Sequence, residues 1–527
     1  MREGPFPGSL GGSNQGVGML ARIQAGTVNG VDWVPVRVEV HLTPGLPSIS
    51  VVGLPQSAVR EGKDRVRAAL TSIGLQLPAQ RVTVNLAPAD IRKEGSGFDL
   101  PLAIGLLICS RHLDPKATRG VAMVGELGLD GGIRPIRGAL AIARGCGQEG
   151  IESLIVPEAN GPEAAMADPD LDVRAAPSIS RLLAHLRGEA PLPRVPSGAL
   201  PGSGTCISES EDLVHVRGQE AAKRALEVVA AGGHNLLLIG PPGAGKTMLA
   251  RRLPGILPPM NRSEALEATT IHSVAGLLPE GEAVLNGRPF RAPHHTISRA
   301  GMAGGGTPVR PGEISLAHRG ILFLDELAEY SRSVLETLRQ PLESGWISLV
   351  RARERYRFPA RFTLVAAMNP CPCGHLGSES RTCVCDPGQV ARYRHRISGP
   401  LRDRIDLTLE VPPIPFAELR GSTERNPSSR EIRDRVLEAR KRQWKRLGAG
   451  RANATMTTVE VDSTSHLDRE GERLLKNASE KLELSARGIH RVLKVARTIA
   501  DLDEADTLAR PHLAEALQYR AVSGWSR

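Results

Sequence analysis

Short, largely apolar runs that end in polar residues are the clearest pattern in the second half of the chain. Three of them span residues 236–239, 321–324 and 362–368. Strands of a parallel sheet that is covered on both faces have this composition. We therefore predict an α/β core in which polar side chains collect where these strands end.

The first half of the chain mixes two periodicities. Residues 34–40 alternate and residues 81–86 favour a further strand, whereas residues 57–70 place Val59, Val66 and Leu70 on one helical face. Residues 431–527 favour helices with faces rich in Arg and Lys. These patterns predict an N-terminal α+β domain and a C-terminal helical one.

Three segments interrupt the patterns and set the expected domain boundaries. Residues 1–18 are Gly-rich, residues 188–210 are rich in Pro, Gly and Ser, and residues 421–430 form another polar break. We predict a disordered tail over 1–18, a first domain over 19–187, a linker over 188–210, a second domain over 211–420 and the helical domain over 421–527.

Composition narrows the class of protein. Hydrophobic residues make up 41% of the 527 residues and charged residues 24%, which excludes a wholly disordered chain. The longest apolar stretch, residues 100–109, is well short of the about 20 residues that a membrane span needs. The N-terminus has no signal-peptide core, so we expect a cytoplasmic protein without membrane contact. The net charge of +10 fits an ordinary solvated surface as well as a nucleic-acid partner.

A Gly-rich segment follows the first apolar run and precedes a helical one. In this context it matches the phosphate-binding motif GxxxxGK[ST], whose glycines let backbone N–H groups surround phosphates at a helix N-terminus. Lys246 is expected to reach the β- and γ-phosphates and Thr247 to bind Mg²⁺, so ATP with Mg²⁺ is the expected ligand. The residues of the motif are Gly240, Pro241, Pro242, Gly243, Ala244, Gly245, Lys246 and Thr247.

Carboxylates and an amide end the other two apolar runs. Asp325 and Glu326 follow four apolar residues, where acids are costly unless they serve a site. Asp325 is expected to hold Mg²⁺, directly or through water, and Glu326 to orient and deprotonate the attacking water. Asn369 could position water against the γ-phosphate; the alternative is a turn-forming Asn before Pro370.

Four further segments carry a resemblance to a known family, namely residues 290–296 (FRAPHHT), 310–318 (RPGEISLAH), 322–327 (LFLDEL) and 398–406 (SGPLRDRID). With the phosphate-binding motif, they resemble the magnesium-chelatase-like branch of the AAA+ ATPases typified by ComM and YifB. The resemblance extends from Met19 onward. It implies an AAA+ P-loop core with a helical lid, and a homo-oligomeric ring, expected to be a hexamer, with ATP at the subunit interfaces.

In such rings a neighbouring subunit supplies an arginine that stabilises charge on the transferred phosphoryl group. The resemblance assigns this role to Arg404, with Arg402 as the second candidate. The alternative for Arg404 is an ion pair with Asp403 or Asp406. The resemblance also assigns Arg487 to the sensor-2 element, where it would touch the γ-phosphate and couple the lid to the nucleotide state.

Four of the seven cysteines lie within 15 residues, as two CxC pairs separated by nine residues. Cys371, Cys373, Cys383 and Cys385 could close a structural, tetrahedral Zn²⁺ site, although CxC is tighter than the usual ligand spacing. His375 is a fifth candidate ligand, and a set of reduced surface thiols is the alternative.

Arginines alternate with other residues over 351–361. Period-2 spacing would place them on one face of a β-hairpin, and this hairpin resembles one that helicase-like AAA+ rings project into the pore. An arginine row there could follow a DNA backbone; an exposed strand with protective charge is the alternative. A second segment, 291–306, contains His294, His295 and three consecutive glycines, and is expected to be structural or to form a pore loop. The arginines are Arg351, Arg353, Arg355, Arg357 and Arg361.

Residues 92–103 and 125–136 resemble two segments of Lon-type proteases. In Lon a Ser–Lys pair does the chemistry, but residues 137–142 contain no Lys and Ser96 lies off the nucleophile position. The resemblance therefore implies a Lon-like domain of the ribosomal-S5 type that has lost proteolysis and serves oligomerisation or DNA contact.

Together these features favour an ATP-driven ring motor on single-stranded or branched DNA, a branch-migration helicase that promotes recombination and integration of transforming DNA. The first alternative is the motor subunit of a magnesium chelatase, which the Lon-like domain and the cysteine cluster disfavour. The second is a Lon-like ATP-dependent protease, which the missing lysine disfavours.

Overall fold

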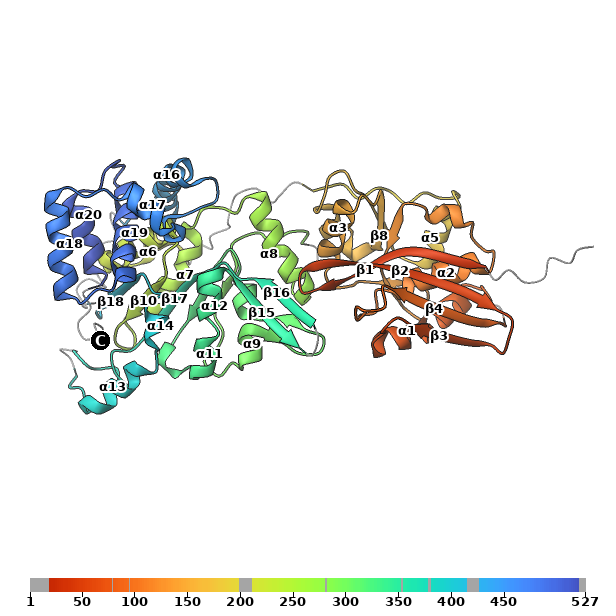
Figure 1. Ribbon diagram of the computed structural model, residues 1–527, viewed down its shortest axis with the longest axis horizontal. Helices are drawn as coiled ribbons and strands as arrows, with labels where there is room; N and C mark the ends of the chain where they lie inside the picture. Colours follow the sequence, from red (N-terminus) through yellow and green to blue (C-terminus); the bar gives the residue numbers. More distant parts are fainter. Residues whose placement is uncertain are drawn as a thin grey trace, which may run out of the picture. The chain divides into compact units, whose positions relative to one another are not determined.

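The computed structural model describes residues 19–77, 79–93, 95–198, 211–279, 282–351, 354–377, 381–414 and 426–520. The predicted disordered tail, 1–18, lies outside these residues. The chain divides into two compact units, one over Met1–Gly198 and Pro279–Ala283 and one over Ala199–Leu278 and Val284–Arg527. Each unit has a sheet with helices packed beside it (Figure 1).

The first unit is built on a seven-stranded sheet with the order β3-β4-β2-β1-β5-β8-β9. Strands β1, β2 and β4 are antiparallel neighbours, whereas β3–β4, β1–β5, β5–β8 and β8–β9 are parallel pairs. The strands are β1 (Leu20–Asn29), β2 (Asp32–Thr43), β3 (Ser48–Val52), β4 (Arg81–Ala87), β5 (Val121–Met123), β8 (Ser153–Pro157) and β9 (Asp172–Ala176), and β6 (Glu126–Leu127) pairs separately with β7 (Ile133–Arg134). The helices are α1 (Ser57–Ser72), α2 (Asp99–Cys109), α3 (Ala139–Gln148), α4 (Gly161–Ala165) and α5 (Ile179–Leu186).

The longest apolar stretch of the sequence forms the centre of this unit. All residues of α2 are buried, and α2 packs against β1 and β2. Strand β4 alternates buried and partly exposed residues because only one of its faces meets the core. The period-2 patterns of the sequence thus become strands, and its continuous apolar run becomes a fully buried helix.

Part of the predicted linker is packed against the first unit. Residues 188–198 belong to the first unit, where Leu192 is buried in the core and the N–H of Val195 donates to the carbonyl of Val173 at 2.8 Å. A segment rich in Pro and Gly is expected to have irregular backbone, but such backbone can still pack against a domain, as it does here. The rest of that segment, 199–210, lies outside the described residues.

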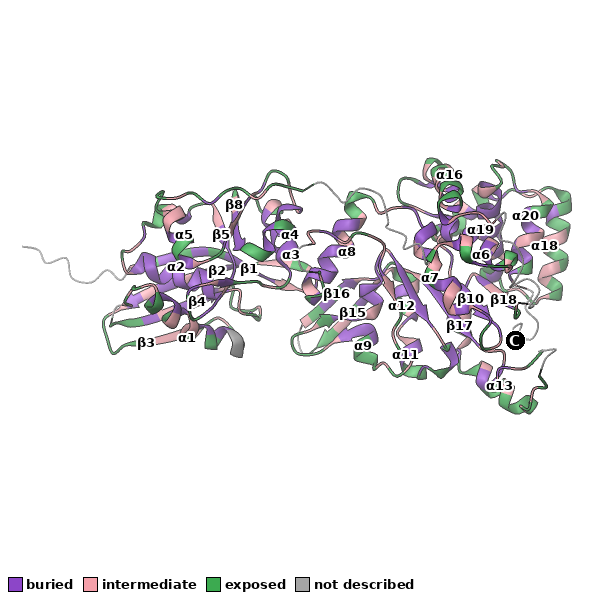
Figure 2. Cartoon of the chain, turned by 180° about the vertical axis from the view of Figure 1, so that it is seen from behind, coloured by how far each residue is buried: buried purple, intermediate pink, exposed green. Residues whose placement is uncertain are grey.

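The second unit is built on a fully parallel five-stranded sheet with the order β11-β14-β17-β10-β18. Strands β10 and β14 are buried at every position, as Figure 2 shows for β10. The strands are β10 (Leu236–Ile239), β11 (Phe290–Arg291), β14 (Ile321–Leu324), β17 (Thr363–Met368) and β18 (Leu407–Glu410). Around them lie α6 (Glu220–Gly232), α7 (Lys246–Ile256), α8 (Arg262–Ala275), α9 (Arg299–Ala303), α10 (Glu313–Leu316), α11 (Arg332–Glu336), α12 (Arg339–Ser344), α13 (Pro387–His395) and α14 (Gly399–Arg402).

Two hairpins stand outside this sheet. Strand β15 (Trp346–Arg351) pairs antiparallel with β16 (Glu354–Pro359), and β12 (Gly304–Gly305) pairs with β13 (Arg310–Pro311). The first of them is the hairpin that the alternating arginines predicted.

The C-terminal helices share a core with the sheet. Helix α16 packs on α6 and α7, and α19 packs on α6, so the described residues on both sides of the predicted break at 421 belong to one compact unit. The C-terminal helices are α16 (Ser429–Leu447), α17 (Thr458–Thr464), α18 (Arg469–Lys481), α19 (Ala486–Leu502) and α20 (Arg510–Gln518).

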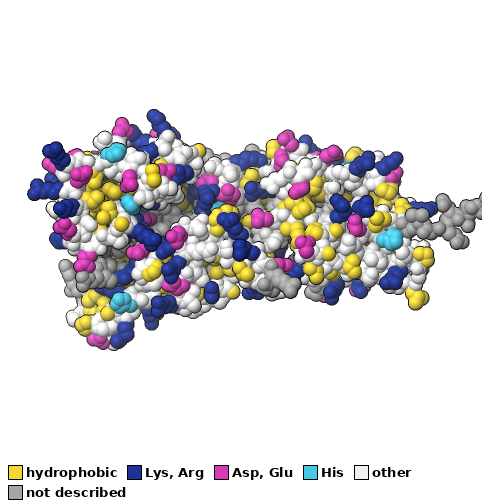
Figure 3. Space-filling view, in the orientation of Figure 1, with side chains coloured by type: hydrophobic (Ala, Val, Ile, Leu, Met, Phe, Trp, Pro, Cys, Tyr) yellow, Lys and Arg dark blue, Asp and Glu magenta, His cyan; other side chains and the backbone are white. Residues whose placement is uncertain are grey.

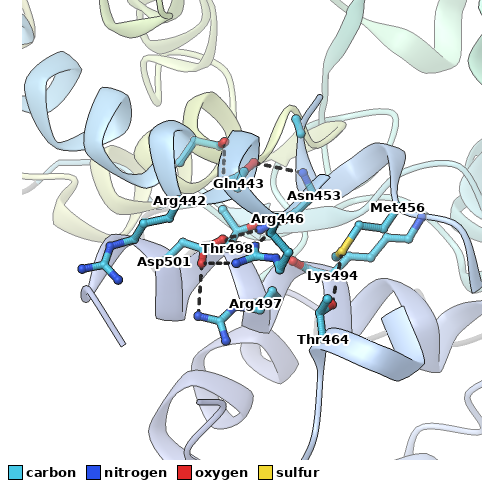
Figure 4. Close-up of polar contacts among 12 residues, drawn as sticks. Arg442, Gln443, Arg446, Asn453, Met456, Thr464, Lys494, Arg497, Thr498 and Asp501 are labelled. Carbon is cyan, nitrogen blue, oxygen red and sulfur yellow. Dashed lines mark hydrogen bonds and ion pairs between the residues drawn. The ribbon is translucent and has the colours of Figure 1, made fainter. Parts of the chain in front are cut away.

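A buried polar network joins α16, α19 and the short turn Asn453–Thr455 that follows α16 (Figure 4). The carboxylate of Asp501 accepts from Arg446 at 2.7 Å and from Asn453 at 2.8 Å, and it lies 3.1 Å from Arg497. The amide of Gln443 donates to the carbonyl of Ala231 in α6 at 3.0 Å. Since every partner would be costly to leave unpaired in the interior, the network fixes these helices to one another and to α6.

Candidate functional site

The loop between β10 and α7 has the geometry of a phosphate-binding loop. Gly243 and Gly245 have φ angles of +79° and +87°, a left-handed backbone that glycine adopts without a steric cost. Lys246 is the first residue of α7. The loop therefore delivers the N-terminus of α7, with its free N–H groups, to the carboxyl edge of the sheet.

The ammonium of Lys246 lies across this loop. Its Nζ donates to the carbonyl oxygens of Gly240 at 2.6 Å and Pro241 at 2.9 Å, and to Oδ1 of Asn369 at 3.2 Å. Burial lowers the pKa of Lys246, and the charges of Asp325 and Glu326 oppose that shift. The structure thus brings Asn369, at the end of β17, to the lysine of the motif, as the strand ends predicted.

Thr247 and Asp325 are also in contact. The hydroxyl of Thr247 donates to Oδ2 of Asp325 at 2.6 Å, while Oδ1 of Asp325 accepts from the N–H of Glu326 at 2.9 Å. A hydroxyl and a carboxylate oxygen at this separation are the hard oxygen ligands that Mg²⁺ prefers. The pair fits a Mg²⁺ that arrives with a nucleotide.

Glu326 has a partner that the sequence did not reveal. Its backbone is left-handed, with φ of +51°, and its Oε2 lies 3.2 Å from Nδ1 of His295. His295 was expected to be structural or part of a pore loop. It follows β11, which pairs with β14 in parallel, so the residues after both strands meet at the same edge. Because β11 has only two residues, no apolar run marked it in the sequence.

Arg404 and Arg487 lie at the other edge of the same sheet. Both line a cavity of about 780 Å³ that is also bounded by Asn235 and Asp406, which precede β10 and β18, and by Thr363, the first residue of β17. Lys246 and Asn369 instead follow their strands. A strand of four residues separates the two edges by roughly 13 Å, so neither arginine belongs to the phosphate loop of its own chain.

Arg404 makes a different ion pair from the one considered in the sequence. Its Nη2 donates to Glu343 at 2.7 Å and its Nη1 to the carbonyl of Pro400 at 2.6 Å. The hydrogen bond from Arg404 holds the pKa of Glu343 below its usual range, and the charge of Arg487 acts in the same direction. The second candidate, Arg402, lines a separate pocket with Cys385 and α13.

The four clustered cysteines converge. Their sulfur atoms all lie within 4.8 Å of one another. The separations Cys371–Cys373, Cys371–Cys383 and Cys373–Cys383 are 3.4, 3.6 and 3.6 Å. These are too long for a disulfide, but they approach the edge of about 3.8 Å of a tetrahedron of sulfurs around Zn²⁺. Among the described residues, the group that could hold a metal ion contains Cys385 but not His375.

The arginines of the hairpin divide between its two faces. Val350 pairs with Arg355 and Ser348 with Arg357, whereas Arg351 pairs with Glu354. Arg355 and Arg357 are exposed, and Arg357 stacks 4.1 Å above the ring of Trp346. Arg351 lies on the face of Tyr356 and donates to the carbonyl of Gly306 at 3.0 Å. The prediction of one common face was therefore wrong for Arg351.

Two other members of that arginine set stand apart. Arg361 lies beyond β16 and lines the 780 Å³ cavity. Arg353 lies outside the described residues. Elsewhere on the face seen in Figure 3, Lys and Arg side chains intermingle with acidic ones, as the modest net charge indicated.

No Ser–Lys pair is present among the described residues of the Lon-like segments. The hydroxyl of Ser96 donates to Glu126 and the ammonium of Lys93 to the carbonyl of Pro88. Asp99 is buried and accepts from Arg65 at 2.7 Å. The polar side chains near Ser96 thus satisfy one another.

A parallel sheet with a phosphate loop, a Thr–Asp pair and an Asn at its carboxyl edge defines a P-loop ATPase core of the AAA+ type. Family models described as magnesium chelatase, subunit ChlI; subunit ChlI of Mg-chelatase; and magnesium chelatase, subunit ChlI C-terminal match residues 212–419, 38–160 and 426–520. The competence protein ComM of Haemophilus influenzae is 45% identical, with 95% of this chain and 98% of ComM covered. The uncharacterized protein YifB of Escherichia coli is 45% identical, with 94% and 95% covered. The chain belongs to the ComM/YifB family of magnesium-chelatase-like AAA+ proteins.

A more distant match concerns the Lon resemblance. A Lon protease of Roseiflexus castenholzii is 26% identical over 160 residues, which cover 28% of this chain and 19% of that one. Within the described residues, none of the helices is long and apolar enough to cross a lipid bilayer.

Proposed function

We propose that the protein is an ATP-hydrolysing ring motor that acts on single-stranded or branched DNA, as a branch-migration helicase in the integration of transforming DNA. The competence name of the Haemophilus relative supports the setting, and AAA+ membership supports ATP hydrolysis with Mg²⁺. The single observation that carries the proposal is the split of the site between the two edges of one sheet.

The split suits a head-to-tail ring, in which each interface joins different surfaces of two copies. In this proposal the carboxyl edge of one subunit binds ATP and the amino edge of its neighbour completes the site. Arg404 and Arg487 then contact the γ-phosphate of the neighbouring subunit's nucleotide, so the sensor arginine acts between subunits and not within its own.

Each residue of the carboxyl edge has one task in this mechanism. Lys246 neutralises charge on the phosphates, and Thr247 with Asp325 holds Mg²⁺. Glu326 accepts the proton of the attacking water, and Asn369 orients that water. Arg404 of the neighbour stabilises the charge that builds on the transferred phosphoryl group.

The cysteine cluster is proposed to hold a structural Zn²⁺. Four thiolates complete the coordination shell, which leaves no open position for a catalytic water. The cluster begins two residues after Asn369 in the chain. Zinc there would brace the segment that connects the end of β17 to α13.

A chelatase-type motor is the second candidate, because the matching family models carry that description. The N-terminal domain was expected to argue against it. However, residues 38–160 match a model described in the same way, so this domain does not separate the two functions.

The nature of the partner does separate them. We expect ATP turnover by the full chain to rise on addition of single-stranded DNA or a four-way junction, and to be unaffected by a porphyrin with a large chelatase subunit. Turnover that is indifferent to every DNA, or that responds to the porphyrin assembly instead, would overturn the DNA-motor proposal.

A further inference from the structure

The two faces of the β15–β16 hairpin differ in character. On one face the side chains of Ile347, Tyr356 and Phe358 are buried. Residues that pair directly across antiparallel strands share a face, and successive residues alternate between faces. The other face, here termed the open face, carries side chains that are exposed or half-buried. Its residue pairs are Trp346 with Pro359, Ser348 with Arg357 and Val350 with Arg355.

On the open face, the guanidinium of Arg357 lies over the indole of Trp346. Its Cζ is 4.1 Å from the ring centroid, which is the range of a cation–π contact. Although the side chain of Arg357 is exposed, its guanidinium forms no ion pair and no hydrogen bond within the described part of the chain. The indole therefore fixes this guanidinium and covers one of its faces, while the opposite face is left to solvent.

A guanidinium held in this way can stack on an unpaired base. Bases stack on aromatic rings and on the planes of arginine side chains. A base within a duplex has its faces covered by neighbouring bases, whereas an unstacked base of a single strand can offer its face to a protein. The N–H edge of the same guanidinium stays available for a phosphate oxygen, so one side chain can contact both the base and the backbone of the strand.

The rest of the open face suits the same ligand. Arg355 lies two residues from Arg357 along β16, about 7 Å away, and can reach another phosphate. Val350, its partner across the hairpin, is 68% exposed. An exposed apolar side chain adds nothing to phosphate binding, but it can contact the face of a base. Cations interleaved with groups on which bases stack are the pattern of a single-strand binding site.

We propose that Arg357, held on the indole of Trp346, is a stacking platform for an unpaired base, so that the hairpin selects single-stranded DNA by its bases as well as by its phosphates. Arg357 touches the base, and Trp346 is a positioning residue that acts through it. The inference deepens the proposed function and rests on its DNA partner.

The test measures binding of the full-length protein to two oligonucleotides of equal length, one with bases and one whose sites are all abasic and which keeps only the backbone. Arg357→Lys retains the charge but loses the plane. It should weaken binding of the oligonucleotide with bases by about 5-fold or more, the lower end of base stacking, and leave binding of the abasic one and the salt dependence unchanged. Trp346→Leu should produce the same selective loss, and the double variant should lose no more than either single one.

Two further variants separate stacking from charge. Arg355→Lys, on the open face but without a ring beneath the side chain, should change binding of both oligonucleotides by the same factor. Arg469→Lys, at an exposed arginine at the start of α18, is the matched control and should bind both as wild type does.

The outcomes distinguish this inference from the proposed function. If Arg357→Lys weakens both oligonucleotides equally, or neither, or if wild type binds them equally well, no base stacks on Arg357 and the inference is overturned while the DNA motor stands. If the losses of Trp346→Leu and Arg357→Lys add, the two side chains do not act as one platform. A wild type that binds neither oligonucleotide removes the DNA partner and the inference together. Should Trp346→Leu fail to fold, Arg357→Lys decides alone, because it alters only an exposed side chain.

Discussion

At the level of single residues, the ammonium of Lys246 is a buried cation whose hydrogen-bond partners carry no negative charge. All of its hydrogen bonds go to neutral oxygens, and burial lowers its pKa. A buried cation without a hydrogen-bonded anion is costly to the fold. A nucleotide would supply the missing charge.

This imbalance gives a prediction with two parts. Lys246→Met removes the charge and keeps an unbranched side chain, so the melting temperature without ligand should stay unchanged or rise. Loss of the phosphate contact should cost about 2–5 kcal/mol of ATP affinity, which is about 30-fold or more. Thermal-shift titrations with ATP and Mg²⁺ measure both effects. A variant that melts earlier yet binds ATP normally would contradict the assignment.

Sequence reasoning succeeded at residues whose place follows from a strand end. Lys246, Asp325 and Asn369 each follow a buried apolar run, so parallel pairing alone collects them at one edge. His295 could not be found in this way, because β11 is two residues long and pairing rather than hydrophobicity places it.

At the level of elements, the β15–β16 hairpin shows where a periodic pattern stops being informative. Within one strand, successive side chains alternate between the two faces. The pairing of the two strands then decides which residues of β15 share a face with which residues of β16. Here Arg351 pairs with Glu354, so odd positions of β15 share a face with even positions of β16. That register separates Arg351 from Arg355 and Arg357.

The register predicts different outcomes for these arginines. Replacing Arg355 and Arg357 together by Glu should weaken DNA binding and flatten the dependence of log K on log salt by about 1.4 for single strands, because two phosphate contacts are lost. Binding measured across a salt series tests this. Arg351→Ala is the comparison: this side chain lies on the other face and contacts Gly306, so the variant should change the salt slope less than the double variant does. An unchanged salt slope in the double variant would assign the hairpin a purely structural role.

The cysteine cluster also depends on how segments of the chain are arranged, because its four sulfur atoms come from two short segments, 371–373 and 383–385, that meet. We expect purified protein to contain about one zinc per chain and Cys383→Ser to lose it. Cys146, buried in the first unit and remote from the cluster in sequence, provides the control: Cys146→Ser should keep the metal. Protein without zinc, or with zinc retained in Cys383→Ser, would return the cluster to a set of reduced thiols.

At the level of the whole molecule, one sheet presents two incomplete halves of a catalytic site at opposite edges, and only assembly joins them. Arg404→Ala and Glu326→Gln should each be inactive alone. In an equimolar mixture, about a quarter of the interfaces of a head-to-tail ring unite an intact Glu326 with an intact Arg404. ATP turnover should therefore return to about a quarter of the wild-type rate. Glu343→Ala, which removes the partner of Arg404 but not the arginine, should stay active, so that loss of the ion pair is separated from loss of the finger. If the mixture is as inactive as its components while both variants assemble normally, Arg404 does not act on a neighbouring subunit, because only an arginine that serves another copy's nucleotide can be complemented in trans.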